Sequence, residues 1–365
     1  MRKVYVAVRR AICVTAGVSL LAVAAAAQAS DEPTVIRVES STIGDRFENK
    51  RHEPSNIASI SGEQVDESHA ANIQMLLQSI PGVTTELQSG DSLKIHIRGV
   101  ENQRYMGEKP GVAVVIDGVP VFERTGRVNI DLDNIDSIKV VKGGASYLYG
   151  EDALSGAVII TTKKGAKMAG YKVEGEVGSF GHRKGLARAG FASENASGHL
   201  QVSQRQTDGY YFDSDSKAAY VNGKWQYYLD DASDITVGFE WSDREKDSHG
   251  TVEGVTQAAT DPKSVEGRDY TRMYDVDLDK LFVTYGRDIN DSQTLTFNTY
   301  QFRDQTQFVS KPQRYDGTGA AVTDVDAYTT GNDYQQVQRG IKSELRSEGE
   351  GRHGRGSCLL SKMQK

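Results

Sequence analysis

The chain has 365 residues, of which 38% are hydrophobic, and 43 Lys and Arg against 50 Asp and Glu give a net charge of −7. This acidic balance argues against a dedicated nucleic-acid binder, because such proteins bind by neutralising phosphates. Beyond the first thirty residues, no apolar run approaches the roughly 18 residues that a membrane-spanning helix needs.

The first segment, residues 1–29, has the pattern of a secretory signal peptide. An apolar stretch from Ala11 to Ala27 ends in the small-residue pattern Ala27-Gln28-Ala29. Four basic residues precede it: Arg2, Lys3, Arg9 and Arg10. A basic start, an apolar centre and an A-x-A end are typical of a cleaved signal, so we expect export and a mature chain that begins at Ser30. An uncleaved membrane anchor is the alternative, but the stretch is short and contains Gly17 and Ser19.

Residues 30–56 are polar and irregular, and we expect an extended, exposed segment there. Its one β-prone stretch is Thr34-Val35-Ile36-Arg37-Val38, just after Pro33. A disordered leader that happens to contain valines is the other interpretation of this stretch.

Residues 57–165 predict an α/β unit. Ser61 and Gln64 have the spacing of a capping box ahead of a helix. A second helical stretch places four apolar residues on one face and is stopped by Pro81-Gly82; these residues are Ile73, Leu76, Leu77 and Ile80. Residues 93–98 alternate like a half-buried strand, residues 112–116 and 119–122 flank the hairpin turn Asp117-Gly118, and residues 158–162 predict a buried strand.

Residues 166–345 predict antiparallel strands. About eight segments have strand character, near 171–180, 184–192, 199–207, 218–229, 234–243, 274–287, 293–303 and 334–345. The connections alternate between short ones, near 193–198, 230–234 and 290–292, and long polar ones, near 208–217, 243–273 and 304–333. This alternation is typical of an outer-membrane β-barrel, in which periplasmic turns are tight and extracellular loops are long. A soluble β-sandwich is the alternative.

Four ordered motifs connect the chain to a known family. They are "NIQMLLQSIPGV" (72–83), "LKIHIRGV" (93–100), "VAVVIDGVPV" (112–121) and "IDSIKVVKGGASYLYGEDALSGAVIITTKKG" (135–165). With these motifs the chain resembles the N-terminal part of a TonB-dependent outer-membrane receptor. It departs from the usual pattern at Lys139, Gly144 and Ala157.

The resemblance implies an α+β plug domain at 57–165, followed at 166–345 by the first transmembrane strands of an incomplete barrel, about 8 of the 22 in the family. It also implies a location in the outer membrane of a Gram-negative cell. Thr34, Val35, Ile36, Arg37 and Val38 match the TonB box, which the periplasmic protein TonB would bind. The positions that match the plug motifs are Pro81, Gly82, Arg98, Gly99, Asp117, Gly118, Gly143, Gly144, Tyr149, Gly150 and Gly156.

The resemblance further implies active transport of a scarce small molecule, with an iron-siderophore as the first expectation and haem or cobalamin as alternatives. A structural outer-membrane barrel without transport is the alternative from another class, but it would leave the α/β unit unexplained. Outer-membrane lipid and TonB are the expected partners, and nucleic acid is not. Residues 346–365 lack alternation and contain Cys358, so we expect an aberrant tail and a truncated chain that is not competent for transport. Either the gene product is truncated or the reading frame shifts near Arg346 to Gly351.

No pattern in the sequence predicts an enzyme, a cofactor or a bound metal. The glycines between Gly143 and Gly156 are not followed by the Lys-Ser/Thr pair of a phosphate-binding loop. Asp275, Asp277 and Asp279 begin like a calcium loop, but Lys280 and Gly286 stand where that loop needs Gly and Glu. The seven histidines lack metal-site spacing. His249, in the longest connection, could contact a haem or a metal complex, but a solvated loop histidine is the favoured interpretation.

Overall fold

The structure is a computed structural model of the whole chain. It describes residues 57–70, 72–87, 93–101, 111–121, 130–143, 153, 155–211, 214–248, 252, 254–263, 270–290, 293–312, 330–347 and 354–364. The predicted signal peptide and the predicted TonB box lie outside these residues. No helix within the described part of the chain is both long enough and apolar enough to cross a membrane.

The first part of the described chain is an α/β unit. Its elements are β1 (Ile57–Ser61), α2 (Gly62–Ser68), α3 (Ile73–Gln78), β2 (Val83–Leu87), β3 (Leu93–Ile97), β4 (Val100–Glu101), β5 (Val112–Ile116), β6 (Val119–Pro120), the 3₁₀ turn η3 (Leu132–Asn134), β7 (Ile135–Lys142), β8 (Gly156–Thr162) and the 3₁₀ turn η4 (Ala166–Met168). One sheet has the order β1-β7-β8-β5-β6, in which β5 and β8 run parallel, and a smaller sheet has the order β2-β3-β4.

The two helices begin where the sequence predicts. The Ser61 N–H donates to Gln64 Oε1 over 2.9 Å and the Gln64 N–H donates to Ser61 Oγ over 3.3 Å, which forms the capping box of α2. Asn72 caps α3 by accepting from the Met75 N–H over 3.1 Å. These caps satisfy backbone donors that the first turn of a helix leaves without a partner.

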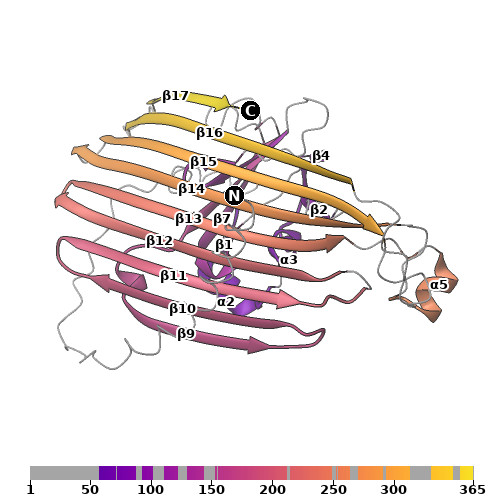
Figure 1. Cartoon of the computed structure of the whole chain (residues 1–365). Coiled ribbons are helices and arrows are strands. Elements are labelled where there is room, and N and C mark those ends of the chain that lie inside the picture. Colours follow the sequence, from indigo (N-terminus) through magenta and orange to yellow (C-terminus); the bar gives the residue numbers. More distant parts are fainter. Residues whose placement is uncertain are drawn as a thin grey trace. The chain divides into compact units, whose positions relative to one another are not determined.

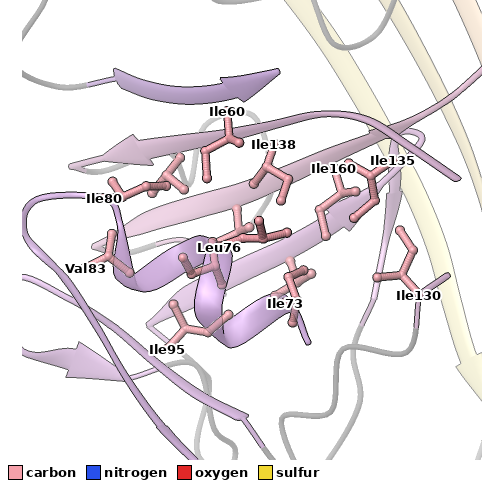
Figure 2. Packing of buried hydrophobic residues seen from close by; sticks show 14 of the residues in the cluster. Ile60, Ile73, Leu76, Ile80, Val83, Ile95, Ile130, Ile135, Ile138 and Ile160 are labelled. Atoms are coloured by element: carbon pink, nitrogen blue, oxygen red, sulfur yellow. The ribbon is translucent and has the colours of Figure 1, made fainter. Parts of the chain in front are cut away.

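The core of this unit lies between α3 and the strands, as Figure 2 shows. The apolar face of α3 is buried, and Leu77 is 0% exposed. Strand residues of both sheets complete the cluster, among them Ile95, Ile97, Ile138 and Ile160. The predicted apolar spacing of the helix therefore produces the buried face that holds the unit together.

The second part is a nine-stranded antiparallel sheet, which we call the wall. Its strands are β9 (Gly170–Val177), β10 (Arg183–Ala192), β11 (Ala196–Thr207), β12 (Ser216–Asp230), β13 (Ser233–Ser248), β14 (Tyr270–Asn290), β15 (Gln293–Pro312), β16 (Thr330–Ser347) and β17 (Gly354–Gln364). They lie side by side in chain order (Figure 1). The eight expected segments correspond to β9–β16, and β17 adds a strand within residues that we expected to form a tail outside the barrel.

The two faces of the wall reverse the pattern of a soluble sheet. On β12 the polar side chains of Asn222, Lys224 and Gln226 are buried, whereas Trp225 and Tyr227 are 41% and 53% exposed. On β12 the wall thus has a polar inner face and an apolar outer face, whereas the inner face of β14 and β15 also carries buried apolar side chains, among them Leu278, Phe282 and Phe302. A sheet exposes an apolar face without penalty where lipid, not water, covers it.

The outer face is apolar over only part of the strand length. On β13 it carries Val237 and Phe239, and further along it carries Asp243 and Glu245. β14 has 21 residues, about twice the 9–11 that a membrane-crossing strand needs. The strands therefore extend beyond the apolar band, on the side of the long connections 208–215, 249–269 and 313–329.

Candidate functional site

The plug-motif residues that the structure describes form turns of the α/β unit. Gly82 follows α3 with φ +81°, and Arg98 and Gly99, at φ +54° and +82°, form the turn between β3 and β4. Asp117 and Gly118, at φ +52° and +77°, form the predicted two-residue turn between β5 and β6. Positive φ at both central positions is the geometry that favours Asp-Gly in tight hairpins.

Two further glycines of the motifs have local structural roles. A Cβ at Gly156 would overlap the carbonyl oxygen of Val141 on the neighbouring strand, so only glycine fits there. Gly143 has φ +124° and lies beside the Arg98 guanidinium. Gly144, Tyr149 and Gly150 lie outside the described residues.

The Asp117 carboxylate is the centre of a buried polar cluster between the α/β unit and the wall. The Thr162 N–H donates to Oδ1 over 2.9 Å and the Thr162 hydroxyl donates to Oδ2 over 2.7 Å. From β12, Lys224 Nζ donates to Oδ1 over 3.1 Å and to the Thr162 carbonyl over 3.0 Å. From β14, Lys280 Nζ lies 4.0 Å from Oδ2.

Glu240 of β13 completes this group, because its Oε2 lies 2.7 Å from Lys280 Nζ. The side chains of Asp117, Lys224, Glu240 and Lys280 are all between 2% and 6% exposed. We call these four residues and Thr162 the Asp117 cluster. The remaining cavity there is about 10 Å³, which is room for at most about one water molecule.

The electrostatics of the cluster favour the ionised form of Asp117. Burial alone would raise the pKa of Asp117, but Lys224, Lys280 and the two hydrogen bonds from Thr162 outweigh it and lower the pKa to about 2. The carboxylate is therefore charged at neutral pH and serves as the counterion of the wall lysines.

A second polar cluster joins η3 to the wall. Gln201 Nε2 and Ser203 Oγ donate to Asp131 Oδ2 over 3.0 and 2.8 Å. Arg205 Nη2 lies 3.3 Å from Asp131 Oδ1 and 3.0 Å from Asp133 Oδ2. Lys184 Nζ donates to Asp133 Oδ1 over 2.6 Å. Asn222 Nδ2 of β12 also donates to Asp131 Oδ2 over 3.3 Å, so strands β10, β11 and β12 hold this acidic turn.

Asp131 differs from Asp117 in its titration. Burial and the neighbouring charge of Asp133 raise the pKa of Asp131, against the lowering effect of Arg205 and the hydrogen bonds from Ser203 and Gln201. The pKa values of Asp117 and Asp131 are therefore shifted in opposite directions, although both carboxylates lie against cations of the wall.

A recess of about 250 Å³ lies toward the ends of β11–β13 that carry the long connections. Its lining combines apolar residues of the α/β unit, Ile73, Ile130 and Leu132, with charged residues of the wall. The charged residues are mostly basic and include Arg205, Arg244 and Lys246 beside the one acidic residue that the structure describes in the lining, Glu245. Arg244 and Lys246 share the inner-face alternation of Glu240 and Ser242 on β13. The recess can accommodate an anionic group next to apolar surface.

The segment 218–229 was expected to form a strand, but the sequence patterns did not identify Lys224, Glu240, Lys280 or Arg205 as site residues. The available signal was a charged residue on the face opposite Trp and Tyr in a strand. Asp275, Asp277 and Asp279 lie together on the outer face of β14, where Asp279 pairs with Arg303. Within the described residues, no three His, Cys, Asp or Glu side chains form a metal-binding group.

Comparison with known proteins identifies the two parts. Residues 49–157 match the TonB-dependent Receptor Plug Domain family. The iron-regulated outer membrane virulence protein of Vibrio cholerae is 31% identical over 122 residues, which cover 30% of this chain and 18% of that protein. The hemin receptor of Yersinia pestis is 25% identical over 205 residues, which cover 52% of this chain and 29% of that protein.

The fold extends the similarity into the wall. The ferric-catecholate import receptor Fiu of E. coli K12 superposes with a TM-score of 0.60 at 18% identity, over 80% of this chain and 46% of that one. The chain thus corresponds to only part of each of these proteins. The family consists of receptors and transporters, not enzymes. Residues 49–157 thus match the plug domain of TonB-dependent receptors, and with the antiparallel strands that follow, the chain is similar to the N-terminal part of such an outer-membrane receptor.

Proposed function

We propose that this chain is the plug and the first barrel strands of a receptor that takes up an anionic iron chelate, with energy supplied by TonB. The observation that carries the proposal is the recess at the outer end of the wall. There, cationic side chains of β11 and β13 face apolar residues of the plug. Iron chelates with carboxylate or catecholate groups are both anionic and partly apolar.

The orientation of the recess supports this proposal. Long connections of outer-membrane barrels face the exterior and short turns face the periplasm. The recess borders Thr207 and Ser216, which flank the long connection 208–215. A ligand that arrives from outside would therefore meet Arg244 and Lys246 before it meets the Asp117 cluster deeper in the wall.

The coupling to TonB rests on the predicted TonB box, Thr34–Val38. An extended, β-branched stretch can add to the sheet edge of a partner through main-chain hydrogen bonds. The signal peptide at 1–29 would deliver the chain across the inner membrane and expose this stretch in the periplasm. TonB and outer-membrane lipid are thus the proposed partners.

Haem is the second candidate ligand, because the Yersinia pestis hemin receptor matches about half of this chain and haem propionates are also anionic. Cobalamin fits less well, since its phosphodiester is its only anionic group. The charge of the recess therefore favours the siderophore and haem classes over cobalamin.

The test is a titration of the purified chain in detergent micelles with a ferric catecholate chelate, haem and cyanocobalamin. We expect the ferric chelate to bind, and the double change Arg244→Gln and Lys246→Gln to weaken it at least tenfold. Arg287→Gln, an exposed cation at the opposite end of β14, is the control and should leave binding unchanged. Preference for cyanocobalamin, or equal binding by the double variant, would contradict the proposal.

A further inference from the structure

The turn between β5 and β6 contacts the wall through both ionic and apolar side chains. Asp117 reaches Lys224 on β12 and Lys280 on β14, and Val119 packs against Leu278, Phe282, Tyr300 and Phe302 of β14 and β15. Ionic and apolar contacts thus hold one two-residue turn to three strands of the wall.

The wall part of the Asp117 cluster has unbalanced charge without the plug. Lys224 and Lys280 are two cations, and Glu240 is the one wall carboxylate of the cluster. The ring of Phe282 lies 5.7 Å from Lys224 Nζ and 6.0 Å from Lys280 Nζ, which adds cation–π attraction but no compensating charge. A buried cation that loses its counterion is strongly destabilising, so this position on the wall requires an anion as long as the lysines stay buried.

We propose that Lys224 and Lys280 form a carboxylate-binding site in the barrel wall, which Asp117 of the plug fills at rest and which accepts a carboxylate or catecholate oxygen of the passing ligand once the turn has left. The second half of this statement rests on the proposed function, an anionic iron chelate. In this arrangement the Asp117 carboxylate of the plug competes with the ligand for the site.

The geometry explains why the site must be vacated before it can accept a ligand. Asp117 and Thr162 leave a cavity of only about 10 Å³, which admits no second carboxylate. His199, Glu240 and Asn134 close the remaining sides. An external anion can therefore enter only when the Asp117 carboxylate is absent, either because the plug has moved or because the side chain has been removed.

Removal of the side chain makes the site testable by chemical rescue. Asp117→Gly deletes the carboxylate and suits the backbone, since glycine adopts φ +52° without strain. The readout is hydrogen exchange of residues 112–120 in the full chain in detergent micelles. We expect exchange to rise at least tenfold in Asp117→Gly and to return toward the wild-type rate when sodium formate is added, but not when neutral formamide is added.

Two further variants keep the test decisive. In Asp117→Gly combined with Lys224→Met, formate should no longer slow exchange, because half of the site is gone. Asp66→Asn is the control: it removes a plug carboxylate that pairs with Lys163 of the plug itself, and formate should have no effect on it. If Asp117→Gly does not fold, Asp117→Asn should still raise exchange, and Lys224→Met should partly reverse that rise.

Wild-type exchange in Asp117→Gly or Asp117→Asn would overturn the proposal, as would equal rescue by formate and formamide. Because the readout involves neither iron chelate nor TonB, the outcome is independent of the titration that tests the proposed function. Formate rescue without chelate binding would support the carboxylate site and refute the anionic ligand.

Discussion

The plug core should depend on single buried side chains of α3, and Leu77 is the sharpest case. Leu77 is 0% exposed and lies in the main cluster with Ile95, Ile97 and Ile138. Leu77→Ala removes three carbon groups, which contribute about 0.8 kcal/mol each by burial. The cavity left behind adds to this loss, so we expect the plug to lose about 2–5 kcal/mol of stability.

The assay is native-state hydrogen exchange of α3 and β3 in the full chain in detergent micelles. Since about 1.4 kcal/mol corresponds to a tenfold change in an equilibrium, exchange should accelerate roughly thirtyfold to several-thousandfold. Met75→Ala, in the same helix but 53% exposed, should change exchange by less than about threefold. Equal effects of the two substitutions would refute the assignment of a buried and an exposed face to α3.

Three further changes test other parts of the molecule. Ile36→Pro should abolish binding of a TonB fragment to residues 30–45, because proline removes a main-chain donor; wild-type affinity in a pull-down would exclude the predicted TonB box. Val237→Arg places a charge in the apolar band and should make the free energy of folding into lipid vesicles less favourable by about 2–4 kcal/mol. Glu245→Arg lies beyond the band and should leave this free energy nearly unchanged. A larger loss for Glu245→Arg than for Val237→Arg would show that the band lies elsewhere on the strand. The pKa of Asp117 is lowered from 3.8 to about 2, so its contribution of about 2 kcal/mol is complete above about pH 4 and is lost as the pH falls through 2. Protection of residues 112–120 should therefore differ between wild type and Asp117→Asn at neutral pH and converge near pH 2, and a constant difference would contradict the shift.

Local features of the fold were predictable from the sequence because their physics is local. The capping box of Ser61 and Gln64 involves residues three apart, and Asp117-Gly118 specifies its own turn. The strands of the wall follow from alternation of polar and apolar residues. Their lengths were underestimated, as in β14 at 270–290 against the expected 274–287, because beyond the apolar band the outer face is polar and the alternation disappears.

The site was not predictable in the same way because its members come from distant parts of the chain. Lys224 and Asp117 are 107 positions apart, and only the register of β12 and β14 against the plug turn brings their charges together. The Asp117-Gly118 pair predicted a hairpin turn, which the structure has between β5 and β6. A turn residue at positive φ, however, gives no sign of what its side chain contacts. Likewise, the segment that forms β17 lacks alternation, so its own residues gave no sign that it would pair with β16.

Polar side chains on the inner face of the wall attach the plug through ion pairs and hydrogen bonds. An apolar interface would hold the plug by buried area, which is lost gradually as two surfaces slide apart. Beside the apolar contacts of Val119, the Asp117 cluster and the Asp131 cluster hold it by a few directional contacts, which weaken steeply once the atoms separate beyond hydrogen-bond distance. After that separation, water and anions can solvate the wall lysines, so that a plug tied in this way can be firmly held at rest and still be released by a pull over a short distance.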